Sequence, residues 1–133
     1  MLRDRLSIVL LLVVALADLF LWQRVVSGGT QPALYALDVG QGDSILAVFP
    51  GGMTVLTDAG PDNAVVRELE RVLPPGRRMI DLAVVTHPQL DHFGGFGELL
   101  DRYDVGAFIM NGREEDEGAA KPIWDALVRK IRA

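Results

Sequence analysis

Two histidines and an aspartate lie within six residues of one another, in the stretch THPQLDHFGG at residues 86–95. His87 and His92 are the only histidines of the chain, and Asp91 directly precedes the second one. Neutral imidazole nitrogens and a carboxylate are ligands that suit Zn²⁺, Mn²⁺ or Fe²⁺. The alternative is structural, because His87 or Asp91 could serve only as a helix cap where a strand leads into a helix. The spacing alone supports the two interpretations about equally.

Two further carboxylates stand at the expected ends of strands. Asp58 follows the apolar stretch 53–57, and Asp43 closes a glycine turn at residues 40–42. Taken singly, each is more typical of a turn-forming carboxylate. Their shared position at strand ends favours a common site with the histidines. Asp58 would orient a metal-binding side chain by a hydrogen bond without touching the metal, and Asp43 would face the same edge of the site. The chain has no cysteine, so a metal there must use nitrogen and oxygen ligands.

Alternating strands and helices must position these residues. Short apolar stretches joined by glycine turns predict an antiparallel meander with strands at 33–39, 44–49 and 53–57. Apolar residues at helical spacing predict a helix that begins after the N-cap Asp62 and ends at Leu73. The apolar stretch 80–86 predicts a strand covered on both faces. A helix at 96–103, a buried strand at 105–110 and a last helix with Pro122 in its first turn complete the order β-β-β-α-β-α-β-α.

The N-terminal stretch differs in composition from the rest. Leu6 to Trp22 is almost wholly apolar and long enough to span a bilayer, for which about 17–25 residues suffice. We therefore expect a transmembrane anchor at 1–26, a linker at 27–32 and a domain at 33–133. A cleaved signal peptide is one alternative, since two arginines precede the apolar run and Ala15-Leu16-Ala17 fits a cleavage site. A buried helix is the other. Either of the first two predicts a domain outside the cytoplasm, attached to the cell membrane by one helix if the anchor is kept.

The domain that follows is acidic. From Gln31 onward it has 10 Lys and Arg against 16 Asp and Glu, a net charge of −6. Residues 113–117 (REEDE) are expected to form a charged loop. Such a surface does not hold phosphate backbones by charge alone. A metal or a partner must supply the positive charge if the domain meets nucleic acid.

Three strings together resemble a known family. LDVGQGDSI at 37–45, VLTDAG at 55–60 and VVTHPQLDHFGG at 84–95 are similar to the metallo-β-lactamase-fold domain of ComEC-type DNA-uptake competence proteins. The resemblance runs from about Ala33 to Asn111, and DVGQGDS is its most specific part. It implies an α/β fold of the αββα type, of which this chain holds the N-terminal half. It also implies a dinuclear metal centre with Zn²⁺, or with Mn²⁺ or Fe.

The resemblance assigns roles to five residues. His87 is implied as a ligand of the first metal, and Asp91 and His92 as ligands of the second. Asp91 is also implied as the catalytic group that holds or accepts the proton of the attacking water. Asp58 and Asp43 are implied as supporting residues, Asp43 with the looser assignment.

The sequence departs from the family pattern in two ways. Gln89 stands where the motif H-x-H-x-D-H has its middle histidine, and a neutral amide is a poorer Zn²⁺ ligand than imidazole. In addition, no histidine follows His92, although the fold takes later ligands from its second half. We therefore expect a truncated chain with an incomplete ligand set and little or no catalysis of its own.

The implied activity is hydrolysis of a phosphodiester, with single-stranded DNA as substrate and a DNA-uptake channel and the membrane as partners. One alternative is a hydrolase of the same fold with another substrate, such as a lactam or a thioester. Another is a non-catalytic, membrane-anchored binding module. The missing ligands favour the non-catalytic module for this chain, whereas the DVGQGDS string favours the competence type for its parent protein.

Overall fold

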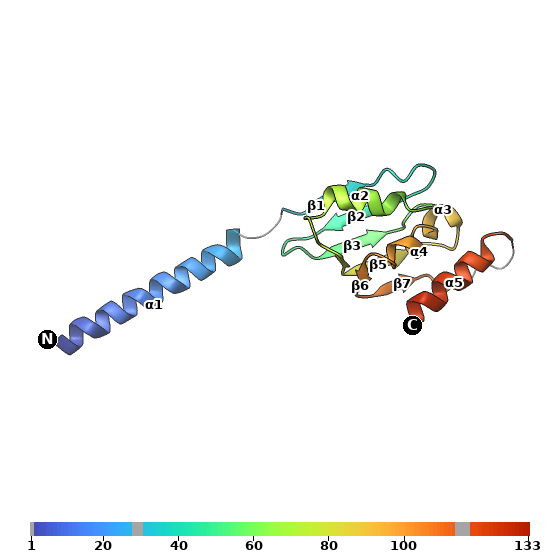
Figure 1. Cartoon of the computed structure of the whole chain (residues 1–133). Helices are drawn as coiled ribbons and strands as arrows, with labels where there is room; N and C mark the ends of the chain where they lie inside the picture. Colours follow the sequence, from blue (N-terminus) through green and yellow to red (C-terminus); the bar gives the residue numbers. More distant parts are fainter. Residues whose placement is uncertain (1, 28–30, 114–117) are drawn as a thin grey trace.

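The structure is a computed structural model and describes residues 2–27, 31–113 and 118–133. Residues 28–30 of the expected linker and 114–117 of the expected charged loop lie outside the described residues. Figure 1 shows an N-terminal helix, α1 (Leu2–Ser27), and a separate α/β domain. The apolar side chains of α1 from Val9 to Trp22 are exposed.

The helix expected in the N-terminal stretch is therefore present, but its interpretation as a membrane span is not supported. Within the part of the chain that the structure describes, no helix has the length and apolar character needed to cross a membrane.

Five strands form the central sheet, in the order β1-β2-β3-β5-β7. They are β1 (Ala33–Ala36), β2 (Ile45–Val48), β3 (Thr54–Thr57), β5 (Leu82–Val85) and β7 (Phe108–Met110). The first three pair antiparallel, which confirms the predicted meander, and β3, β5 and β7 pair parallel. The strands predicted at 80–86 and 105–110 are each split in two, and their first parts, β4 (Met79–Ile80) and β6 (Asp104–Val105), form a separate parallel pair.

The helices cover one face of the sheet (Figure 1). They are α2 (Ala64–Val72), α3 (Leu90–Phe93), α4 (Phe96–Leu99) and α5 (Lys121–Arg132). The core lies between them and the strands, where Leu46, Leu56 and Ala83 are fully buried. Phe93 packs edge-on against Trp124 of α5, with ring centroids 5.0 Å apart, and so ties the last helix to the helices after β5. Parallel strands need such helical crossovers, so β5 and β7 depend on this layer.

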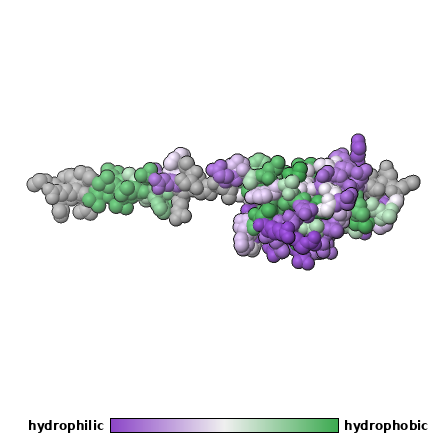
Figure 2. Space-filling view, turned by 90° about the horizontal axis from the view of Figure 1, so that it is seen from above, coloured by the Kyte–Doolittle hydropathy of each residue, from purple (hydrophilic) through white to green (hydrophobic). Residues whose placement is uncertain are grey.

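The other face of the sheet is left open by the described residues. Strand pairing aligns one cross-strand row on it, formed by Ala36, Ile45, Thr57, Val84 and Ile109. Leu34 is 72% exposed and Ile109 53% exposed, because no described element packs on them. Figure 2 shows hydrophobic residues gathered along one side of the domain and hydrophilic residues along the opposite side. The predictions that 80–86 is covered on both faces and that 105–110 is buried are therefore wrong, since helices cover one face only and alternate residues stay accessible.

Two helix boundaries also differ from prediction. The N-cap of α2 is Asn63, one residue after the predicted Asp62. Asp62 still contributes, because its Oδ1 accepts a hydrogen bond of 2.8 Å from the backbone N–H of Ala64. The helix expected over 96–103 is shorter and ends at Leu99, whereas Pro122 stands in the first turn of α5 as predicted.

Candidate metal centre

Three loops meet at the edge of the sheet where β3 and β5 end and β1 turns towards β2. The backbone N–H of Ala59 donates to the carbonyl oxygen of His92 at 2.8 Å, which joins the loop after β3 to helix α3. The N–H of Asp43 donates to Asp91 O at 3.3 Å, and the N–H of Gly60 donates to Asp43 O at 3.0 Å. The loops that carry the three family-like strings are thus bonded to one another, and their carboxylates and histidines gather at one place.

Glycines allow this close approach of the loops. A Cβ atom on Gly42 would lie 2.1 Å from the carbonyl oxygen of Asp91, and one on Gly95 would lie 2.2 Å from that of Ala59. Real Cβ atoms do not come so close to backbone, so any side chain would push the loops apart. Gly42 of GQGD and both glycines of HFGG therefore have a packing reason that is local to this cluster.

Asp58 is at the centre of the cluster. Its side chain is only 5% exposed and accepts hydrogen bonds from Thr86 N at 2.8 Å, Thr86 Oγ1 at 2.6 Å and His92 Nδ1 at 2.9 Å. A carboxylate can only accept, so Nδ1 of His92 carries a proton and the neutral ring presents a lone pair on Nε2. This is the arrangement by which a carboxylate fixes the tautomer and orientation of a metal-binding histidine.

The backbone of Asp58 is held in an unusual conformation. Its φ is +56°, and among the described residues it is the one residue other than glycine with a positive φ. The surroundings fix it there, because its N–H donates to Val84 O at 2.9 Å and its carbonyl oxygen accepts from Ser44 Oγ at 3.0 Å. Strained residues of this kind collect at functional sites.

Two carboxylates face the free nitrogen of His92. Nε2 lies 3.9 Å from Asp43 Oδ2 and 3.8 Å from Asp91 Oδ2, too far for hydrogen bonds. The side chains of Asp43 and Asp91 are 76% and 51% exposed, so both are accessible to solutes. One imidazole nitrogen with carboxylate oxygens is a donor set that suits a divalent ion. Even so, no group of three or more His, Asp or Glu side chains within the described ranges is already placed to hold one.

His87 lies beside His92, with ring centroids 3.9 Å apart and ring planes tilted by 48°. Its contacts are different, however. Nδ1 lies 2.9 Å from Thr86 Oγ1, and Nε2 lies 2.9 Å from Oε1 of Gln89. Both nitrogens of His87 are therefore occupied by neighbouring side chains, whereas only one nitrogen of His92 is.

Two residues of the cluster, Thr86 and Asn111, were not predicted from the sequence. Thr86 links Asp58 to His87, and Asn111 Nδ2 donates to the carbonyl oxygen of Thr86 at 2.6 Å. Both follow strands, β5 and β7, whose carboxyl ends lie side by side. The position of a polar residue directly after each parallel strand was the signal that could have identified them.

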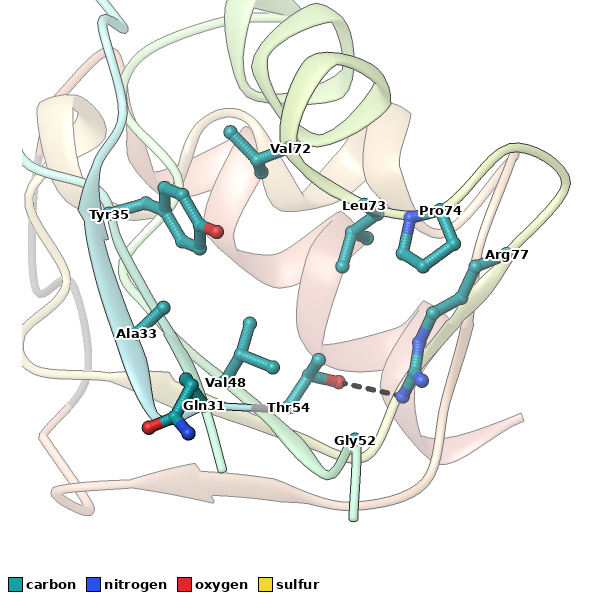
Figure 3. A pocket seen from close by; sticks show the side chains of 10 residues that line it. All are labelled: Gln31, Ala33, Tyr35, Val48, Gly52, Thr54, Val72, Leu73, Pro74 and Arg77. Carbon is teal, nitrogen blue, oxygen red and sulfur yellow. Dashed lines mark hydrogen bonds between the residues drawn. The ribbon is translucent and has the colours of Figure 1, made fainter. Parts of the chain in front are cut away.

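A cavity of about 250 Å³ lies elsewhere, near the end of β2 and the start of β3 (Figure 3). Its lining is mostly apolar, and Figure 3 shows Arg77 at its rim, bonded to Thr54. Arg77 also pairs with Asp81 at 2.9 Å. The backbone N–H and hydroxyl of Thr54, together with Arg77, hold the pKa of the Asp81 carboxyl below its ordinary value. These charged groups satisfy each other, and the histidine cluster remains the candidate site.

Comparison with known proteins agrees with this geometry. The family model described as the metallo-β-lactamase superfamily matches residues 37–126, which include all three loops of the cluster. No curated protein matches the chain. The mixed five-stranded sheet with helices on one face is consistent with part of the metallo-β-lactamase fold. Because the match covers more than half of the chain, this protein belongs to the metallo-β-lactamase superfamily.

Proposed function

We propose that the chain contributes to metal-dependent hydrolysis of phosphodiester bonds in nucleic acid, as a competence-type member of its superfamily. The observation that carries the proposal is the hydrogen bond of 2.9 Å from His92 Nδ1 to Asp58. It leaves the Nε2 lone pair facing Asp43 and Asp91 at the end of a rigid sheet. A histidine that served only for packing would have no need of a buried carboxylate behind it.

Each residue of the cluster has a distinct part in the proposed reaction. Asp58 keeps His92 in the ligand tautomer, and Thr86 keeps Asp58 in place by two hydrogen bonds. Asp91 is exposed enough to turn towards the reacting water and to hold its proton. A divalent ion held here would acidify that water and stabilise the charge that develops at phosphorus.

The nucleic-acid substrate is supported by the DVGQGDS string, whereas the charge of the domain decides how that substrate would be held. With a net charge of −6 from Gln31 onward, the surface repels a phosphate backbone. Substrate would therefore be held mainly through an ion at the cluster. Attachment to a DNA-uptake channel and a location outside the cytoplasm stay predictions.

A second candidate is a binding module of the same superfamily without catalysis. Two observations favour it: His87 is engaged through both nitrogens, and no three acidic or histidine side chains of the described chain are already placed around an ion. The two candidates differ in turnover and agree in metal binding.

The full 133-residue chain, reconstituted with Zn²⁺ or Mn²⁺, would be assayed on single-stranded DNA, bis(p-nitrophenyl) phosphate, a chromogenic lactam and a thioester. Because the ligand set is incomplete, we expect only slow metal-dependent cleavage of the phosphodiesters, reduced at least about tenfold in His92→Ala. Asp38→Ala, which removes an exposed carboxylate from the same loop as Asp43, is the matched control and should keep the activity. Cleavage that is unchanged in His92→Ala, or that occurs only with the lactam or thioester, would overturn the proposal. Metal binding without any turnover would establish the binding module instead.

A further inference from the structure

The two histidines of the cluster differ in what their Nε2 atoms face. Nε2 of His92 accepts no hydrogen bond from any described residue and faces two exposed carboxylates. Nε2 of His87 lies 2.9 Å from the amide of Gln89. The two adjacent rings are thus in opposite states, one open to a ligand and one already paired.

The donors and acceptors around His87 decide how its ring pairs with Gln89. Thr86 Oγ1 has a single proton, which it donates to Asp58 Oδ2 at 2.6 Å, because a carboxylate cannot donate. The hydroxyl oxygen must therefore accept from His87 Nδ1. In the neutral ring the lone pair is then on Nε2, 2.9 Å from Oε1 of Gln89, and a half-turn of the amide brings its N–H₂ to this nitrogen as the donor. In the protonated ring the amide oxygen accepts instead, so the pairing is satisfied in both states.

The local backbone makes this pairing intrinsic to the loop. The N–H of Gln89 donates to the carbonyl oxygen of His87 at 3.0 Å, which folds residue 89 back over residue 87. The N–H groups of His92 and Phe93 both donate to Gln89 O, at 2.9 and 3.1 Å, so Gln89 is fixed at the start of α3. The backbone of Gln89 is thereby fixed beside His87 by short-range contacts, and its exposed amide reaches the imidazole from there.

We propose that Gln89 blocks His87 as a ligand, so that the cluster offers one divalent-cation subsite, built from His92, Asp91 and Asp43, in place of two. Asp43 becomes a direct ligand in this arrangement, because its Oδ2 is as near to His92 Nε2 as that of Asp91. As placed, the three described side chains do not form a group that could hold an ion, and closing on one would require rotation of the two exposed carboxylates. This inference rests on the proposed function and specifies how its metal is held.

The test follows the two imidazoles directly by NMR. The ¹⁵N-labelled full chain is titrated with Zn²⁺, and the nitrogen shifts of both rings are recorded while calorimetry gives the stoichiometry. We expect one ion per wild-type chain, a metal-induced shift of His92 Nε2 and unchanged nitrogens in His87. Two histidines in the whole chain make the assignment simple.

Substitutions separate the blocking residue from the ligands. In Gln89→Ala, His87 Nε2 is released and should also shift on addition of Zn²⁺, whereas Gln41→Ala, at an exposed glutamine of the neighbouring loop, should behave as wild type. Asp43→Asn should weaken Zn²⁺ binding by at least about tenfold, and Asp38→Asn should leave it unchanged.

The outcomes distinguish this inference from the proposed function. Coordination of Zn²⁺ by His87 in the wild type, or two ions per wild-type chain, would overturn the single subsite and leave the metal-dependent function standing. No saturable binding at all would overturn both. If Gln89→Ala failed to fold, the wild-type spectrum would still decide, because it alone reports whether His87 is silent.

Discussion

The stability of the cluster depends on Asp58, and substitutions at this position test that dependence quantitatively. Asp58→Ala removes the acceptor of three hydrogen bonds and leaves His92 Nδ1–H, Thr86 N–H and the Thr86 hydroxyl without their partner. A hydrogen bond to a charged group contributes about 1.5–3 kcal/mol. Thr86 is exposed, so water can partly replace two of the three bonds. We therefore expect a loss of about 4 kcal/mol in the free energy of unfolding, less than the full sum.

The positive φ of Asp58 predicts an unusual order among its variants. At φ +56° a Cβ atom is strained by about 1 kcal/mol, which glycine avoids. Asp58→Gly should thus lose about 3 kcal/mol and be more stable than Asp58→Ala, the reverse of the order found in ordinary helix and strand positions. Urea denaturation followed by circular dichroism measures both values, with Asp38→Ala as a control expected within about 0.5 kcal/mol of wild type. A loss below about 1 kcal/mol for Asp58→Ala, or an alanine variant at least as stable as the glycine variant, would refute the reasoning.

Three further predictions concern the fold of the domain. Gly95→Ala should lower the free energy of unfolding by more than about 2 kcal/mol in urea denaturation, because its Cβ would meet backbone at 2.2 Å. Gly97→Ala, whose Cβ would have no atom within 4 Å, should be neutral or stabilising. Equal effects of the two substitutions would contradict this packing explanation. Leu46→Asp should prevent folding or lower the free energy of unfolding by more than about 4 kcal/mol, because this side chain is fully buried. Ile45→Asp should lower it by about 1 kcal/mol in the same unfolding curves, because Ile45 faces the open side of the sheet. Asp81→Asn should lower the stability at pH 7, because the lowered pKa of Asp81 stabilises the fold only while the carboxyl is ionised. The difference from wild type should shrink as the pH falls below 3.8, the ordinary pKa of an aspartate. A difference that does not depend on pH would argue against this.

The sequence predicted the elements well where local signals are strong. Glycine turns between short apolar stretches gave the antiparallel meander, and helical spacing gave α2 and α5 to within a few residues. The apolar stretches 80–86 and 105–110 were correctly predicted as strands but wrongly as buried throughout. An apolar strand is suited to burial on both faces. Its composition does not show whether a second layer of helices or strands that would cover the other face belongs to the described residues.

The candidate site shows a similar division. The spacing of His87, Asp91 and His92 predicted a shared site, and the position of Asp43 and Asp58 at strand ends predicted that they belong to it. In the structure these five residues lie together at one edge of the sheet. The difference between the two histidines could not be predicted, because it depends on which side chain reaches which ring nitrogen. Gln89 was recognised as a departure from the family pattern, but its pairing with His87 Nε2 is visible only in three dimensions.

The central claim is that His92, fixed by Asp58, is the histidine through which this superfamily member holds a metal. Calorimetric titration of the full chain with Zn²⁺, run side by side for wild type, His87→Ala and His92→Ala, tests it most directly. The account predicts saturable binding of one ion per chain in wild type and in His87→Ala, and its loss in His92→Ala. Equal binding in all three proteins, or loss in His87→Ala with retention in His92→Ala, would contradict it.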